Sequence, residues 1–302
     1  MLKNEKILIT GPASQVAFPI ARELAKSNRV YGLARFSNAK DRANLEAVGV
    51  TCVAADLAQD SFEQVPDDFT YVLNFAVLKS DSFDRDLAAN AEGPGRLMYR
   101  CRKAKAWLHC SSGGVYQLNG HQLLKETDPL GDNHRNTMPT YSISKIAAEV
   151  MARFGARQWN IPTTIARLSV PYGNNGGWPA YHLEAMLAGS PVPVHVDKPS
   201  VYNPIYEDDY IAHIPKLLAV ASVPATVTNW GGSIQVSIEE WCACIGRLIG
   251  VEPKFVYTDR TLASIPMDLT RMHELIGGTR VHWHDGMRRM IRALHPELSL
   301  RE

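Results

Sequence analysis

The first 170 residues alternate short apolar runs with segments whose apolar residues recur every three to four positions. This rhythm is typical of consecutive strand–helix units, which form a parallel sheet with helices on both faces. The expected strands cover residues 6–10, 29–34, 50–55, 71–76, 107–111 and 163–168. The expected helices cover residues 15–27, 40–48, 84–105 and 140–158. We therefore expect an α/β fold with a doubly wound parallel sheet.

The pattern changes after Pro171. Residues 172–179 are rich in glycine, asparagine and proline, which predicts a loop. Shorter elements follow, with helices expected over 181–187, 208–221, 237–248 and 285–294, and strands over 192–196 and 226–230. We expect residues 1–170 to form a nucleotide-binding domain and residues 171–302 to form mainly a smaller C-terminal substrate-binding lobe. Part of that lobe, about residues 203–230, is expected to return to the first domain.

Charge and composition exclude several classes of protein. The chain has 302 residues, with 32 basic and 31 acidic side chains, and its net charge of +1 is too small to attract nucleic acid. No apolar run is long enough to cross a membrane, and the first residues lack the apolar core of a signal peptide. The five cysteines form no CxxC pair, which favours reduced thiols in a cytoplasmic protein and no metal site.

A candidate phosphate loop follows the first expected strand. Gly11 allows a tight turn there, and Ser14, Gln15 and Val16 lead into the first helix. A helix N-terminus offers free amide groups to a pyrophosphate. Ser14 stands where a glycine usually lets the backbone approach the phosphates, so an ordinary strand–helix turn remains an alternative.

The end of the second strand bears on the choice of cofactor. An NAD site usually places an acidic residue there, to bind a ribose hydroxyl. This chain has Arg35 instead, with Ser37 and Lys40 nearby, and an arginine can pair with a 2′-phosphate. We therefore expect NADP(H) rather than NAD(H).

A catalytic constellation is predicted from two segments. Tyr141 and Lys145 are four residues apart, so they share one face of the expected helix. A lysine ammonium one turn away stabilises a phenolate, which makes the tyrosine a general acid or base for a carbonyl and its alcohol. Ser112 follows the fifth strand, at the edge where α/β proteins bind ligands. A chance YxxxK on a helix surface is the alternative.

Taken in order, these motifs resemble the extended short-chain dehydrogenase/reductases, the NAD(P)-dependent epimerase/dehydratases. The similarity spans nearly the whole chain and rests on TGPASQVA (10–17), DL (56–57), NFA (74–76), NAEG (90–93), SSGGVY (111–116), YSISK (141–145), RLSVPYG (167–173), YEDD (206–209) and NWGG (229–232). The resemblance implies a Rossmann-type sheet, a Ser112–Tyr141–Lys145 triad and a homodimer formed through the long helices around the fifth strand. It also implies cofactor contacts from Gly11, Ser14, Gln15, Val16, Arg35, Asp56, Leu57, Phe75, Ala76, Asn90, Tyr141, Lys145 and Val170.

The chain departs from the members of that family that act on sugar nucleotides. Val170 stands where those members offer an asparagine, and residues 200–205 contain no arginine to clamp a diphosphate. We expect a small-molecule substrate without a nucleotide diphosphate, bound in an aromatic-rich pocket formed from Trp178, Tyr181, His182, Met186, His195 and Tyr202. The leading hypothesis is an oxidoreductase for a carbonyl or secondary alcohol. The alternatives are a sugar-nucleotide epimerase or dehydratase and a non-enzymatic protein that has kept the fold.

Overall fold

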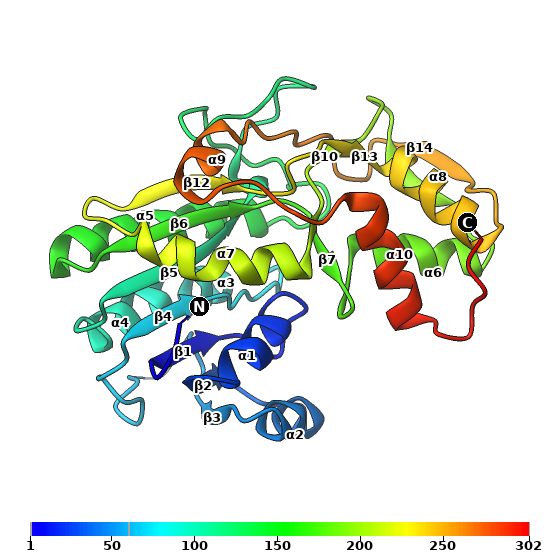
Figure 1. The fold of residues 1–302 in the computed structure, drawn as a ribbon. Coiled ribbons are helices and arrows are strands. Elements are labelled where there is room, and N and C mark those ends of the chain that lie inside the picture. Colours follow the sequence, from blue (N-terminus) through cyan, green and yellow to red (C-terminus); the bar gives the residue numbers. More distant parts are fainter. Residues whose placement is uncertain (1, 60, 302) are drawn as a thin grey trace.

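A seven-stranded parallel sheet forms the centre of the first domain in the computed structural model, which describes residues 2–59 and 61–301 (Figure 1). The strand order is β12-β6-β5-β4-β1-β2-β3. The bounds are β1 Lys6–Thr10, β2 Arg29–Ala34, β3 Thr51–Ala54, β4 Tyr71–Asn74, β5 Ala106–Ser112, β6 Thr163–Leu168 and β12 Thr226–Trp230. The doubly wound sheet is confirmed, and each of these strands lies within two residues of its predicted bounds.

Helices cover both faces of this sheet (Figure 1). One face carries α1 (Ala17–Ala25), α2 (Ala39–Ala47) and α7 (Glu207–Ala219). The other carries α3 (Phe83–Leu87), α4 (Gly93–Arg100) and α5 (Tyr141–Trp159). The predicted single helix over 84–105 is divided, because a π-helical turn at Ala88–Glu92 separates α3 from α4 and the helix ends at Arg100. The π turn carries Asn90, which lines the first cavity described below.

Alternating side chains of the strands bury two separate cores. In β1, Ile7 and Ile9 pack with the residues of α1 and α7, whereas Leu8 packs with the residues of α4. This alternation is the period of two that a β-strand imposes on its side chains. The strands therefore carry apolar side chains on both faces, which is why these segments appear in the sequence as mainly apolar runs.

The second lobe packs helices α6 (Trp178–Leu187), α8 (Ile238–Ile249) and α10 (Trp283–Leu294) against small sheets (Figure 1). A further helix, α9 (Thr270–Ile276), contacts β12. The sheets pair β7 (Pro171–Gly173) with β8 (Gly176–Gly177) and β11 (Ile205–Tyr206), β10 (Val201–Tyr202) with β13 (Val236–Ser237), and β9 (Val192–His195) with β14 (Phe255–Thr258).

The predicted loop over 172–179 is wrong. Those residues form the β7–β8 hairpin and the first turn of α6, because Gly176 and Gly177 adopt the positive φ values that a tight hairpin requires. The helix predicted at 181–187 accordingly begins earlier, at Trp178. The hairpin contacts the phosphate loop, since Asn175 Nδ2 donates to the Gln15 carbonyl over 3.1 Å.

Within residues 2–59 and 61–301, no helix is both long and apolar enough to span a bilayer. All five cysteines fall in this described part, and each carries a free thiol. Four of them are buried, as expected for thiols that pack.

Candidate active site

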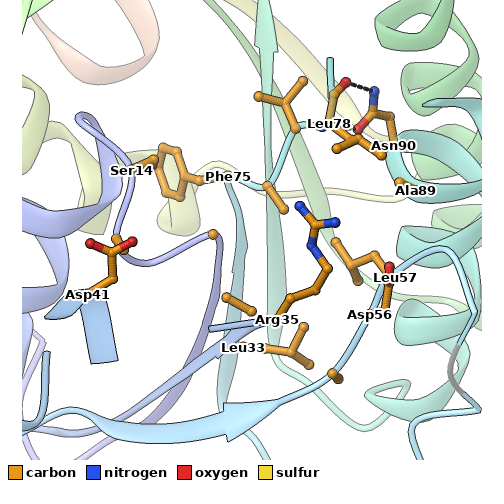
Figure 2. A pocket seen from close by; sticks show the side chains of 16 residues that line it. Ser14, Leu33, Arg35, Asp41, Asp56, Leu57, Phe75, Leu78, Ala89 and Asn90 are labelled. Carbon is orange, nitrogen blue, oxygen red and sulfur yellow. Dashed lines mark hydrogen bonds between the residues drawn. The ribbon is translucent and has the colours of Figure 1, made fainter. Parts of the chain in front are cut away.

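A cavity of about 400 Å³ opens at the carboxyl ends of β1, β2 and β4 (Figure 2). In a doubly wound sheet this is the crevice where the strand order reverses and ligands bind. Eight of the predicted cofactor residues line it, namely Gly11, Ser14, Arg35, Asp56, Leu57, Phe75, Ala76 and Asn90.

The phosphate loop fits an anion. Gly11 has a φ of +62°, and a β-carbon on it would lie 2.9 Å from the Cα atom of Ala76. Only glycine suits this turn. The hydroxyl of Ser14 accepts a hydrogen bond from the Ala17 amide over 3.2 Å, so it caps the start of α1. Within the described residues, the backbone amides of Gln15 and Val16 have no acceptor and remain free for a pyrophosphate.

The far end of the cavity presents charges of both signs. The exposed side chain of Arg35 points its guanidinium into the cavity, and the carboxylate of Asp41 lies at the opposite side (Figure 2). Asp41 belongs to the first turn of α2. The side chain of Asp56 accepts a hydrogen bond from the Ala58 amide over 2.9 Å and so shapes the turn after β3.

Asn90 fixes the wall of the cavity. Its amide exchanges two hydrogen bonds with the backbone of Leu78, one donated by the Leu78 amide over 2.6 Å and one accepted by the Leu78 carbonyl over 2.8 Å (Figure 2). It also donates to Ser144 Oγ over 3.1 Å. Asn90 thereby ties the segment after β4 to helix α5, which carries Tyr141.

A second cavity of about 270 Å³ adjoins the ends of β5 and β6. Ser112 and Tyr141 line it together, with Gln15 and Val170 from the predicted cofactor set. Tyr141 is the first residue of α5, and Ser112 ends β5. The buried Lys145 lines neither cavity, since its ammonium donates to the Cys110 carbonyl over 2.9 Å. Val16 also lines neither cavity.

The electrostatic surroundings of Tyr141 differ from those expected. Burial raises the pKa of the Tyr141 phenol, and a hydrogen bond with Ser112 and the positive charge of Lys79 act in the opposite direction. The Lys79 ammonium lies 4.9 Å from the centre of the Tyr141 ring. Burial also lowers the pKa of Lys145. The cation that acts on the tyrosine in this structure is therefore Lys79, which sequence analysis missed.

One buried carboxylate holds the segments of Lys79 and Tyr141 in this relation. Asp86 is fully buried, and it accepts hydrogen bonds from the Ser80 amide and hydroxyl and from the Thr140 hydroxyl. Ser80 follows Lys79 in the chain, and Thr140 precedes Tyr141. One carboxylate thus joins the two segments that face each other across the site.

The second lobe supplies an aromatic and aliphatic wall. Trp178, Tyr181 and Tyr202 line the second cavity as predicted, joined by Leu262, Ile265 and Met267. The predictions for His182, His195 and Met186 are wrong. His182 is buried and accepts a hydrogen bond from the Trp241 indole, Met186 belongs to the lobe's core, and the ring of His195 accepts from the Asp197 amide.

His134 is a further residue that the sequence did not reveal. It lies in the polar segment before α5 and lines the second cavity. Neither it nor Lys79 belongs to a recognisable motif, and only the fold brings them to Tyr141. Among the described residues, no group of three histidine, cysteine or acidic side chains is placed to hold a metal ion.

Several solved structures share this architecture, and three of them are named as enzymes that act on sugar nucleotides. UDP-glucuronic acid 4-epimerase from Bacillus cereus, solved with NAD and UDP-glucuronic acid, is 20% identical, with a TM-score of 0.80 over 96% of this chain and 100% of its own. UDP-glucose 4-epimerase from Thermotoga maritima is 20% identical, with a TM-score of 0.82 over 97% and 99%. The dTDP-glucose 4,6-dehydratase from Streptomyces venezuelae, solved with NAD, is 20% identical, with a TM-score of 0.79 over 96% and 97%. At these identities the likeness establishes the fold.

No curated protein matches the sequence. A family description does match, over residues 7–227, and it is that of the NAD dependent epimerase/dehydratase family. The match covers well over half of the chain and includes the phosphate loop, Ser112, Tyr141 and Lys145. The chain therefore belongs to the NAD dependent epimerase/dehydratase family of enzymes, whose cofactor is a nicotinamide dinucleotide.

Proposed function

We propose that this enzyme is an oxidoreductase that acts on a carbonyl or secondary alcohol of a substrate without a nucleotide diphosphate. Residues 1–170 hold the cofactor in this proposal, and residues 171–302 mainly close over the substrate. About residues 203–230 complete the first domain, which agrees with the positions of α7 and β12 on the sheet.

The composition of the second cavity carries the proposal. Among its described lining residues, Lys79 is the one cationic side chain, and there is no arginine. A buried diphosphate needs bidentate or multiple cationic partners, which valine and tyrosine cannot replace. Val170, Trp178 and Tyr202 instead offer an apolar surface to the substrate.

The groove fits the cofactor through this chain's own groups. The amides of Gln15 and Val16, which have no acceptor within the described residues, are available to the pyrophosphate, and Gly11 leaves room for it. When bound, the nicotinamide supplies or accepts the hydride. Arg35 in the first cavity supports a preference for NADP(H), because a guanidinium pairs with a 2′-phosphate.

The proton chemistry belongs to Tyr141. Its hydroxyl donates a proton to the carbonyl oxygen in reduction and takes one from the alcohol in oxidation. Ser112 Oγ accepts a hydrogen bond from the Gly114 amide over 3.0 Å, so its own proton, which faces Tyr141, is available to a substrate oxygen placed between the two residues. Lys79 supplies the positive charge that favours the phenolate. The apolar wall excludes water from the reacting oxygen.

A Tyr141→Phe variant tests this assignment. The variant removes the transferable proton but keeps the ring, so we expect turnover of a ketone panel with NADPH to fall by about 10²- to 10⁴-fold. Binding of NADPH, followed by fluorescence, should persist. Tyr257→Phe is the matched control, because Tyr257 is exposed in the second lobe. Full turnover by Tyr141→Phe would exclude the mechanism.

A sugar-nucleotide epimerase or dehydratase is the second candidate. The structural neighbours favour it, because they match this chain along its length and are solved with UDP-glucuronic acid, UDP-glucose or NAD. Tight binding of a UDP- or dTDP-sugar to the cofactor-loaded protein would establish this candidate instead.

We further propose a homodimer formed through α4 and α5. These helices expose Tyr99, Ile143, Val150 and Phe154 to solvent. Apolar side chains gathered on neighbouring helices mark an interaction surface. Light scattering after size exclusion should give twice the chain mass for the wild type and a monomer for Val150→Asp combined with Phe154→Asp.

A further inference from the structure

His134 stands beside the tyrosine of the proposed site. Its ring centroid lies 5.2 Å from that of Tyr141, and its side chain lines the second cavity although the residue is only 5% exposed. Gly114 makes this approach possible, because a β-carbon there would lie 2.7 Å from His134 Cε1 and 3.1 Å from Tyr141 Cε1. The rings of His134 and Tyr141 can therefore approach each other beside Gly114, which has no side chain to separate them.

The neighbouring Asn133 fixes which nitrogen of His134 carries the proton. The Asn133 Nδ2 group donates to two backbone carbonyls, those of Tyr116 over 2.8 Å and Gly113 over 3.3 Å. Its Oδ1 must then face His134 Nδ1, and these two atoms are in contact. Because a carbonyl oxygen only accepts, Nδ1 carries the proton. The other nitrogen, Nε2, is left with a lone pair.

The backbone of His134 is also held. Its amide donates to Ser142 Oγ over 3.2 Å, and its carbonyl accepts from the amides of Thr137 and Met138. These contacts join His134 directly to the first turn of α5. The hydrogen bonds of His134 within the described residues involve its backbone and Nδ1, and Nε2 is not among the fully buried polar atoms without a partner. Because His134 lines the second cavity, Nε2 is the acceptor that its ring can offer there.

We propose that His134 Nε2 accepts a hydrogen bond from a hydroxyl on the carbon next to the reacting carbon, which makes His134 a specificity-determining residue. The inference rests on the proposed function and names its substrate class, the α-hydroxy carbonyls and the corresponding vicinal diols. Ser112 and Tyr141 hold the reacting oxygen, and the adjacent ring of His134 holds its neighbour. The rest of the substrate packs against Trp178, Tyr202 and Met267.

The chemistry of the site supports an acceptor at neutral pH. Burial lowers the pKa of His134 to about 4, with a smaller effect in the same direction from the Lys79 charge. The imidazole is thus uncharged where enzymes of this kind are assayed. A substrate that lacks the hydroxyl would leave a polar nitrogen facing apolar matter, and such mismatches reduce kcat/KM strongly.

Two ketones probe the inference, 2-hydroxyacetophenone and acetophenone, each reduced with NADPH. The readout is kcat/KM for 2-hydroxyacetophenone divided by kcat/KM for acetophenone, measured for each enzyme. Comparing this ratio between the wild type and a variant cancels the intrinsic reactivity of the two ketones. We expect His134→Phe to lower this ratio by about tenfold, the loss of one hydrogen bond. His134→Gln keeps an acceptor and should restore part of it. His121→Phe, an exposed histidine that contacts Asp197, should keep the wild-type ratio.

A second measurement is independent of turnover. A long-range ¹H–¹⁵N spectrum distinguishes the two histidine tautomers, and we expect His134 to carry its proton on Nδ1 and to stay neutral above about pH 5. An unchanged ketone ratio in His134→Phe, or a proton on Nε2, would overturn the inference. If wild-type enzyme consumes NADPH with neither ketone, nor with any member of the ketone panel above, the proposed function itself fails. The tautomer then still decides whether His134 is an acceptor.

Discussion

The ammonium group of Lys79 lies over the ring of Tyr141, 4.9 Å from its centre, while Lys145 is engaged with the Cys110 carbonyl. Two lysines thus surround the tyrosine, one from the segment after β4 and one from the next turn of its own helix. The lysine of the YxxxK pair is fixed by the backbone, and the lysine outside that pair acts on the phenol. This division suggests separate tests for the two cations.

Removal of Lys79 should change the pH dependence of alcohol oxidation. The Lys79 charge lowers the pKa of Tyr141, so Lys79→Met should raise that pKa. Oxidation needs the phenolate, so the rise of the oxidation rate with pH should shift to higher pH. The check is a pH profile of kcat/KM for a secondary alcohol. Lys105→Met is the control, because Lys105 is an exposed lysine before β5. If the pH profile of Lys79→Met matches that of the wild type, Lys79 does not act on the Tyr141 phenol.

Arg35 should decide which nicotinamide dinucleotide binds more tightly. Its guanidinium points into the first cavity (Figure 2), so Arg35→Ala should weaken NADPH binding by about tenfold or more and leave NADH binding nearly unchanged. Fluorescence titrations of the stripped protein measure both. Arg29→Ala at the opposite end of β2 is the control. Equal losses for both cofactors, or tighter NADH binding by the wild type, would assign the cavity to NAD instead.

Gly114 should be intolerant of a β-carbon. Gly114→Ala would press on His134 and Tyr141, at 2.7 and 3.1 Å, and one of these rings must shift. A displacement of this size in a catalytic group costs roughly 10²-fold in rate. Because Gly114 does not line the first cavity, NADPH affinity should stay within about twofold of the wild type. Steady-state rates and titrations on one sample separate the two effects, and an unimpaired rate would show that the rings are not fixed.

The buried pair Arg167–Glu149 should matter for stability. Arg167 Nε and Nη2 donate to the Glu149 carboxylate over 2.9 and 2.8 Å, and both side chains are almost fully buried. Glu149→Ala would leave a buried guanidinium unpaired, at a cost of about 3–5 kcal/mol in the free energy of unfolding. Urea unfolding measures this loss. The double variant Glu149→Met, Arg167→Met should lose far less of its free energy of unfolding than Glu149→Ala. Equal losses in the two variants would show that an unpaired buried charge is not the cause.

The same pair predicts a pH effect of known sign. Burial alone would raise the pKa of Glu149, but the hydrogen bonds and charge of Arg167 outweigh it and hold the pKa below its usual value. A lowered pKa in the folded state contributes stability above the ordinary glutamate pKa. This contribution to stability should disappear as the pH falls through the lowered pKa of Glu149 in the folded state. The double variant, which lacks the carboxylate, should not show this loss of stability.

Much of the fold follows from local pattern. The six strands of the first 170 residues are recognisable because buried parallel strands are apolar throughout, and the long helices are recognisable from their period. Several strands of the second lobe, such as Val201–Tyr202 and Val236–Ser237, contain only two residues. Strands this short carry no periodicity, and glycines that form the β7–β8 hairpin resemble those of an irregular loop.

Residues of the candidate site could be predicted from the sequence only where they belong to a recognisable motif. Ser112, Tyr141 and the phosphate loop lie in segments whose spacing has a mechanical reason. Lys79, Asp41 and His134 lie in polar segments of ordinary composition, and they reach the cavities through tertiary contacts such as the Asp86 hydrogen bonds. His182 and His195 were predicted to line the pocket but bind other residues of the lobe instead. Their aromatic and polar character alone does not show whether a residue lines a cavity or packs within the lobe.

In our proposal, the cavity at Ser112 and Tyr141 takes a substrate without a nucleotide diphosphate. The most direct test is calorimetric titration of the NADPH-loaded and NAD-loaded protein with UDP-glucose, UDP-glucuronic acid and dTDP-glucose, run beside NADPH consumption with the ketone panel. The account predicts no measurable heat from the three sugar nucleotides and consumption of NADPH with at least one ketone, which Tyr141→Phe abolishes. Micromolar binding of a sugar nucleotide, with no ketone reduced, would contradict it.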